Sequence, residues 1–200
     1  MDCPGWARLR NERSESALKS TPFWTEQRKM TMDGVDLVAK LMVIAATTAP
    51  KSKGENYVRT RLLDGQDIAK LADAMEHYGR RTGKKDFDRD AAGVRRSAVV
   101  VLIGIQNATV VGLDCGACGF ADCRSLQKSR RSDGEFLGPQ CAFRLLDMGI
   151  ALGSAVKTAG QLNVDNRIMY RIGAVVRQLG IVDWDFVMGV PLSVTGKNIF

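Results

Sequence analysis

The chain has 200 residues, of which 45% are hydrophobic, so it is long enough to bury one core of ordinary size. The apolar run Ser97 to Ile105 is too short to cross a bilayer, and we expect no membrane-spanning helix. A net charge of +7 permits an acidic protein partner, an anionic cofactor or a nucleic acid, and selects none of them.

The first half of the chain predicts two helices after a polar start. Residues 1–30 indicate a leader or arm. Asp33 can cap a helix that runs to about Thr47, because apolar residues recur there every three or four positions. The polar loop Lys51–Asn56 follows, and Leu62 to Gly79 predicts the second helix. We expect the charged stretch Arg80–Arg96 to be an exposed connection.

The second half predicts the strands and two more helices. Ser97 to Ile105 is rich in Val and Ile, which is typical of a strand buried on both faces. Ala108–Leu113 is a second strand candidate, and Phe186–Val190 a third, followed by a loop up to Lys197. Phe143–Ala159 is apolar on nearly every side and predicts a central helix. Asp165 should cap a last helix that ends at Gly180, and this order of elements indicates an α+β fold.

Four of the five cysteines fall in one stretch, Leu113 to Phe143. They are Cys115, Cys118, Cys123 and, after a gap, Cys141. The N-terminus shows no apolar signal sequence, so we expect a cytoplasmic, reducing compartment in which thiols bind metal more often than they form disulfides. Four thiolates can complete an iron–sulfur cubane, and this spacing predicts such a cluster. Cys3 is the unused fifth cysteine.

Zinc is the main alternative to iron and sulfide in a four-cysteine site. Structural zinc sites usually have two short cysteine pairs, whereas here a third close cysteine and a distant fourth follow the first pair. His77 is the single histidine of the chain, which argues against a His-based zinc hydrolase and a Ser-His-Asp triad. A zinc-stabilised nucleic-acid binder stays as an alternative, although aromatic residues make up only 6% and no basic–aromatic alternation occurs.

The cysteine pattern is similar to the four-iron module of electron-transport and corrinoid iron–sulfur proteins. Together with four other motifs it resembles the uncharacterised prokaryotic family of ferredoxin-domain-containing proteins, over about Met30 to Phe200. These motifs lie at Ala49–Gly54, Gly138–Phe143, Gly149–Val156 and Gly189–Asn198. That family in turn resembles the nitroreductase fold, which implies a small, mostly antiparallel sheet flanked by helices. The resemblance makes residues 31–200 one such α+β domain with an inserted cluster loop at 113–143.

The resemblance to nitroreductases also implies FMN at the interface of a homodimer. By position, the flavin-binding residues would be Lys51, Ser52, Lys53, Asn56, Gly153, Ser154 and Lys197. Lysines and glycine-flanked amides suit a phosphate dianion.

These features predict a redox protein with one 4Fe-4S cluster, with FMN as a further expected cofactor, that links a one-electron carrier to an unknown acceptor. No acid, base or nucleophile stands out, so any catalysis would belong to the cofactors, and whether the protein is an enzyme is left open. The competing interpretation is an electron-transfer or scaffold subunit without flavin or substrate. Four basic residues follow the third cysteine and predict a docking surface for an acidic electron carrier: Arg124, Lys128, Arg130 and Arg131. We expect neither a nucleic-acid nor a membrane partner.

Overall fold

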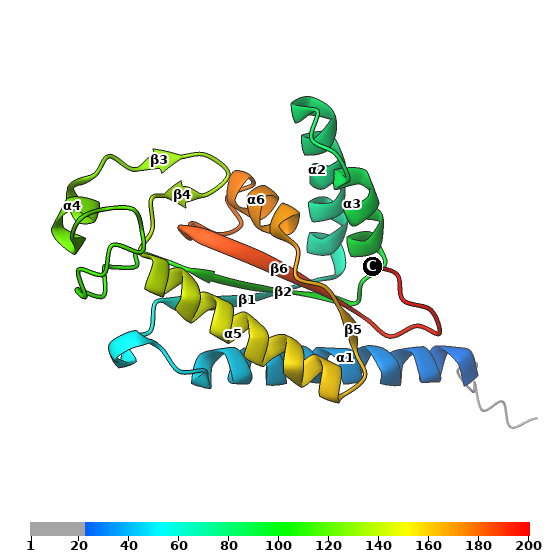
Figure 1. The fold of residues 1–200 in the computed structure, drawn as a ribbon. Helices are drawn as coiled ribbons and strands as arrows, with labels where there is room; N and C mark the ends of the chain where they lie inside the picture. Colours follow the sequence, from blue (N-terminus) through cyan, green and yellow to red (C-terminus); the bar gives the residue numbers. More distant parts are fainter. Residues whose placement is uncertain (1–22) are drawn as a thin grey trace, which may run out of the picture.

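The computed structural model describes residues 23–200, and its centre is a four-stranded antiparallel sheet (Figure 1). The strand order is β1 (Val58–Asp64), β2 (Val99–Ile105), β6 (Phe186–Ser193) and β5 (Asp165–Asn166). Every residue of β2 is buried, because this strand has a neighbour on each side and helices over both faces. The predicted strand at Ser97–Ile105 is therefore confirmed, as is the α+β class.

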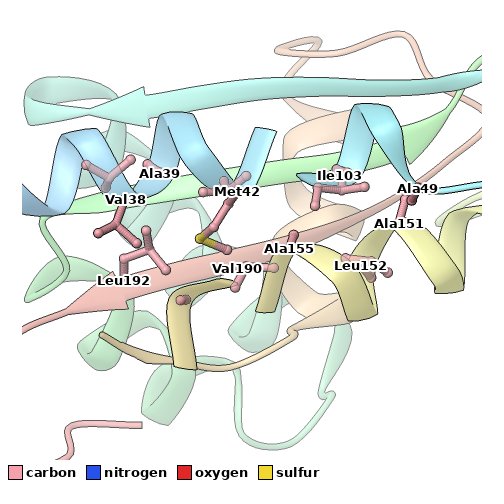
Figure 2. Close-up of a cluster of buried hydrophobic side chains, with 14 of the residues drawn as sticks. Val38, Ala39, Met42, Ala49, Ile103, Ala151, Leu152, Ala155, Val190 and Leu192 are labelled. Atoms are coloured by element: carbon pink, nitrogen blue, oxygen red, sulfur yellow. The ribbon is translucent and has the colours of Figure 1, made fainter. Parts of the chain in front are cut away.

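Helices α1 (Phe23–Thr48) and α5 (Ala142–Gln161) lie side by side on one face of the sheet. Figure 2 shows the core that they share with the strands, where Met42 of α1 and Ala155 of α5 meet Val190 of β6. Alternate residues of β2, Val101 and Ile103 among them, belong to this core, since successive side chains of a strand point to opposite faces.

Three helices cover the other face: α2 (Gly65–Thr82), α3 (Phe87–Arg95) and α6 (Tyr170–Gln178). Their core takes the remaining residues of β2, Val100 and Leu102. Helix α6 lies very close to β6, because a Cβ built on Gly173 would be only 1.8 Å from the carbonyl oxygen of Val187. Only glycine fits at this contact.

The remaining elements are short and lie in the two loops of functional interest. The 3-10 turn η1 (Ser52–Gly54) follows α1. Helix α4 (Cys123–Lys128) and the hairpin of β3 (Ser132–Asp133) and β4 (Leu137–Gly138) lie between β2 and α5. No helix among residues 23–200 combines the length and the apolar character needed to span a membrane.

The start of α1 differs from the prediction of a helix capped by Asp33. The helix already includes Phe23, so it takes in part of the predicted leader, whose residues 1–22 lie outside the described range. Residues 29–34 are exposed, which leaves no buried stripe from which a helical period could be recognised. The hydroxyl of Thr31 donates to the carbonyl of Gln27 one turn earlier.

Two elements were missed because their exposed charged residues conceal the pattern. Strand β1 includes the first residues of the helix expected at Leu62–Gly79 and the residues just before it; it is an edge strand with exposed Arg59 and Arg61. Helix α3 lies in the stretch expected to be an exposed connection, and it buries Phe87. Its buried Asp90 is paired with Arg171 of α6 at 2.7 Å, a partner that the local sequence does not indicate.

The strand predicted at Ala108–Leu113 was wrong, and so was the helix start at Asp165. Asn107 has a positive φ of 52°, and the chain leaves the sheet there as an irregular segment. Asp165 and Asn166 form β5 on the edge of β6, and α6 begins only at Tyr170. Strand β6 also continues to Ser193, into residues that were expected to be a loop.

Helix α5 is present as predicted, but it is not enclosed on all sides. One face packs on α1 and the sheet, while Leu146, Gly149, Ile150 and Gly153 are exposed. The prediction of a central helix followed from apolar residues on every side. The structure instead leaves an apolar face without cover among the described residues.

Candidate functional site

The cysteine window, residues 113–143, lies at one end of the sheet beyond β2 (Figure 1). Cys115 and Cys118 are in the loop, Cys123 is the first residue of α4, and Cys141 is the residue that precedes α5. All four thiols are free. Cys115 is exposed, Cys118 and Cys123 are half-buried, and Cys141 is buried. The solvent exposure of the four thiols therefore decreases along the window, from Cys115 to Cys141.

The backbone of the loop turns tightly around the first three cysteines. Gly116 and Gly119 both have positive φ, 69° and 85°, and the amide of Gly119 donates to the carbonyl of Gly116 at 2.9 Å. Asp114, also with positive φ, accepts a 2.8 Å hydrogen bond from the amide of Cys123. Asp122 caps α4 through the amide of Ser125, which lowers the pKa of Asp122 below its ordinary value. These contacts hold Cys115 to Cys123 as one compact turn.

A small apolar cluster joins this turn to the start of α5. Its buried members are Val111, Leu126 and Cys141, and Cys118 and Phe120 pack against it. Two of the four thiols thus share one apolar environment. Among residues 23–200, no three His, Cys, Asp or Glu side chains are grouped closely enough to hold a metal ion. Four free thiols on one loop nevertheless form the donor set that a four-iron cluster requires.

The hairpin of β3 and β4 ties the middle of the window to the body. Phe136 stacks on Phe186 of β6 with ring centroids 4.1 Å apart. Glu135 accepts hydrogen bonds from the hydroxyl of Tyr78 and the ammonium of Lys84, each at 2.8 Å. Burial alone would raise the pKa of Glu135, but these two donors lower it below the ordinary value. The stretch between Cys123 and Cys141 is therefore fixed on α2 and β6.

Arg144 lies one turn into α5 from Cys141 and is fully buried, with 0% of its surface exposed. Its Nε donates to the carbonyl of Thr109 at 2.9 Å, which connects α5 with the segment that leads to Cys115. Its other nitrogens donate to the carbonyl of Ser52, at 3.1 Å, and to the carboxylate of Glu55.

Two further groups complete the surroundings of Arg144. Asp147 is 3.3 Å from its Nη1, and the guanidinium lies 4.6 Å from the ring centre of Tyr57. Neither Arg144 nor Asp147 was predicted from the sequence as a functional residue. A charged pair at positions i and i+3 of an otherwise apolar helix was the available signal.

The structure uses several of the predicted flavin residues within the chain itself. Lys51 donates to three carbonyls at the end of α1, those of Ala46, Thr47 and Ala49, at 2.6–2.8 Å. Burial lowers the pKa of Lys51, and the nearby carboxylate of Asp147 opposes that shift.

Ser52 and Asn56 also have partners inside the chain. Both the amide and the hydroxyl of Ser52 donate to Asp147 at 2.8 Å. The side-chain oxygen of Asn56 accepts from the amide of Val58 at 3.0 Å. Lys53 is exposed, has a φ of 57°, and directs its ammonium towards Gly112.

The other predicted flavin residues lie elsewhere on the chain. Gly153 and Ser154 are midway along the outer side of α5, and a Cβ built on Gly153 would meet nothing within 4 Å. Lys197 follows β6 two residues after Thr195, which lines a cavity beside the first half of α1. The loop 51–56 follows the opposite end of that helix, about 30 Å away at 1.5 Å per residue. A single chain therefore does not bring the loop and Lys197 to one flavin.

Two cavities lie beside these segments. One of about 610 Å³ is bounded by the first half of α1, the residues before β2 and the end of β6, with Thr31, Arg96, Ser193 and Thr195 among its polar groups. A second, of about 300 Å³, is lined by part of the cysteine window, including Cys141. The larger cavity is near Lys197 and the smaller one is near the thiols.

Known proteins resemble this chain in sequence and in fold. Residues 137–200 match the family model described as "Uncharacterized protein containing a ferredoxin domain (DUF2148)", a range that includes Cys141. An uncharacterized protein from Archaeoglobus fulgidus is 49% identical over 166 residues, which cover 83% of this chain and 90% of that protein.

Among solved structures, the FMN-dependent nitroreductase from Mycobacterium smegmatis, determined in complex with NADPH, has a TM-score of 0.52 at 12% identity and covers 80% of this chain and 78% of its own. A nitroreductase family protein from Clostridium novyi gives 0.50 at 15%, over 81% and 77% of the two chains. An oxidoreductase containing FMN gives 0.50 at 18%, over 80% and 67%. The chain has the nitroreductase fold and belongs to the family of uncharacterised proteins that contain a ferredoxin domain.

Proposed function

We propose that this redox protein holds one 4Fe-4S cluster on Cys115, Cys118, Cys123 and Cys141, and that it passes electrons between a one-electron carrier and an acceptor. The observation that carries the proposal is the set of four free thiols on one loop, the last of them at the start of α5, in a ferredoxin-domain protein. A bound cluster supplies one-electron transfer at a potential that its surroundings set.

The residues of the window have separate roles in this proposal. Leu126, Phe120 and Val111 shield Cys141 from water and so lower the local dielectric around its sulfur. The exposed side of Cys115 leaves the other end of the site open to a partner protein. The hairpin holds the middle of the window, and α5 holds its end, at fixed positions on the body of the fold.

Anaerobic purification with iron, sulfide and flavin assays tests the proposal directly. We expect about four irons and four sulfides per chain and broad visible absorption that is bleached by dithionite. Zinc in place of iron, or a colourless protein without iron, would contradict it. Iron without flavin, and without affinity for added FMN, would favour an electron-transfer or scaffold subunit with no substrate of its own.

A second proposal is that a homodimer binds FMN, and it rests on the exposed apolar face of α1. Met30, Leu37, Leu41 and Ile44 repeat at the heptad spacing, and Leu37 and Ile44 are each 57% exposed. The exposed residues of α5, Leu146 among them, lie on the neighbouring helix.

The two groups of predicted flavin residues lie at opposite ends of this face. A two-fold pairing of the face would bring the loop 51–56 of one copy to the Lys197 end of the other, beside the cavity of about 610 Å³. Arg96, whose guanidinium donates only to carbonyls, and Lys197 would meet the phosphate there. The FMN-bearing proteins of the same fold support this proposal.

Replacing Leu41 with Glu tests the dimer. A buried carboxylate at the centre of an apolar interface is costly, so we expect the variant to elute as a monomer and to bind FMN at least tenfold more weakly than the wild type. Sedimentation velocity and fluorescence titration with FMN measure the two effects. Leu179→Glu, at an exposed leucine that follows α6, is the matched control and should leave both unchanged. A wild-type monomer that still binds FMN would contradict the pairing.

We also propose that the basic surface of Arg124, Lys128, Arg130 and Arg131 docks an acidic electron carrier. All four residues are exposed on α4 or just after it, and among residues 23–200 only Arg131 approaches a carboxylate, that of Asp185 at 3.9 Å. An electrostatically steered encounter falls with ionic strength.

Reversing two of these charges, in the variant R124E/K128E, tests the docking surface. We expect the second-order rate of reduction by an acidic ferredoxin to fall about tenfold at low salt and to lose its salt dependence. The variant K70E/R80E makes the same change of charge on α2 and is the control. Equal rates in the three proteins, with equal salt dependence, would show that the surface has no docking role.

A further inference from the structure

The loop of residues 51–57 is bonded to the two segments that flank the cysteine window. The hydroxyl of Tyr57 lies 2.7 Å from the hydroxyl of Thr109, and the carbonyl of Tyr57 accepts from the amide of Gln106. Arg144 links Thr109 with Ser52 and Glu55. The loop is therefore fastened to the segment that enters the window and to the helix that leaves it.

Lys53 directs its charge towards Gly112, in the segment that leads to the first cysteine. A Cβ built on Gly112 would lie 3.6 Å from Nζ of Lys53, and Gly112 is separated from Cys115 only by Leu113 and Asp114. The positive φ of Lys53 turns the loop at this residue. The ammonium thus lies beside the backbone that leads directly into the thiol site.

The other charges at this junction compensate one another. Arg144 and Lys51 supply two positive charges, and Asp147 and Glu55 supply two negative ones: the guanidinium of Arg144 is paired with both carboxylates, and the ammonium of Lys51 lies near Asp147. Such a compensated group contributes little net field, whereas Lys53 adds a single positive charge. A positive charge near a redox group favours the reduced, more negative state.

We propose that the loop 51–57 is the second wall of the cysteine site, with Arg144 as the positioning residue that holds it and Lys53 as the charge that raises the reduction potential of the site. This inference rests on the proposed cluster. It gives a loop first assigned to flavin a role toward the thiols of its own chain.

The first test measures the midpoint potential of the cluster in Lys53→Met by anaerobic titration. We expect the equilibrium constant for one-electron reduction to fall severalfold, and tenfold would correspond to about 59 mV. Because Lys53 is exposed, the difference should shrink as salt is raised. Lys70→Met, at an exposed lysine on α2, is the control and should keep the wild-type potential. A wild-type potential in Lys53→Met at low salt would overturn the inference.

The second test asks whether Arg144 positions the loop. Arg144→Lys keeps the charge but loses the fork that reaches Thr109, Ser52 and Glu55 together. In Arg144→Lys we expect faster amide exchange at residues 51–57 and 106–113. We also expect that adding Lys53→Met to this variant shifts the midpoint potential by at most half as much as it does in the wild type. Should Arg144→Lys fail to fold, Asp147→Asn, which weakens the hold on Ser52, is the replacement.

The control for Arg144 is Arg171→Lys, because Arg171 also contacts a carbonyl, two carboxylates and aromatic rings, but on α3 and α6. In Arg171→Lys, amide exchange should become faster only outside residues 51–57 and 106–113. If Arg144→Lys left amide exchange at residues 51–57 and 106–113 unchanged, Arg144 would not be a positioning residue. A wild-type protein without iron would contradict the proposed function, and the Lys53 test could then not be made. Amide exchange measured on the iron-free protein would still decide the role of Arg144.

Discussion

The Cys118→Ser variant should lose nearly all of its iron and the visible absorption that goes with it. Cys118 is half-buried against the apolar cluster that contains Cys141, so it lies where the loop and the start of α5 meet. A serine hydroxyl is a hard donor that replaces the soft thiolate poorly, and three remaining thiols leave one iron without its ligand. Iron and sulfide analysis after anaerobic purification, with the visible spectrum, measures the loss.

Two comparisons make this result specific. Cys3→Ser changes the cysteine outside the window and should keep the full iron content. Far-ultraviolet circular dichroism should show that Cys118→Ser keeps its helices, because the core on both faces of the sheet does not include this residue. A Cys118→Ser protein that keeps its iron would remove Cys118 from the ligand set.

Among the glycines of residues 23–200, Gly173 should be the one at which replacement by Ala destabilises the fold most, because its added Cβ makes the shortest contact. The added Cβ would lie 1.8 Å from the carbonyl oxygen of Val187 and 3.3 Å from Phe136, so α6 must move away from β6. Overpacking of this kind costs about 1–3 kcal/mol or more, and better helix propensity returns about 1 kcal/mol. We therefore expect a net loss of about 2 kcal/mol in the free energy of unfolding, measured by urea denaturation.

The matched control is Gly160→Ala in the last turn of α5, where an added Cβ meets nothing within 4 Å. That change should leave stability the same or slightly higher. Because Phe136 belongs to the hairpin inside the cysteine window, Gly173→Ala should also release iron faster than the control does. Equal stability of the two variants would show that α6 can shift on β6 without cost.

The sequence by itself determined the elements whose signal is local. The Val- and Ile-rich run of β2 predicts a strand buried on both faces, because such a strand needs no polar alternation. The four cysteines indicate a metal site, since ligand chemistry and close spacing can be recognised without a fold. Helix α5 follows from its length and apolar content.

Only the tertiary structure decided which polar residues have partners and where they lie. Ser52 and Asp147 are 95 positions apart in the chain yet share hydrogen bonds, and two distant segments supply acceptors to the buried Arg144. A residue pattern reports the local period of a helix or strand. Contacts between distant segments depend on how the helices pack on the sheet, so the fold alone places Lys53 beside Gly112, and the residues just before Lys197 beside the first half of α1.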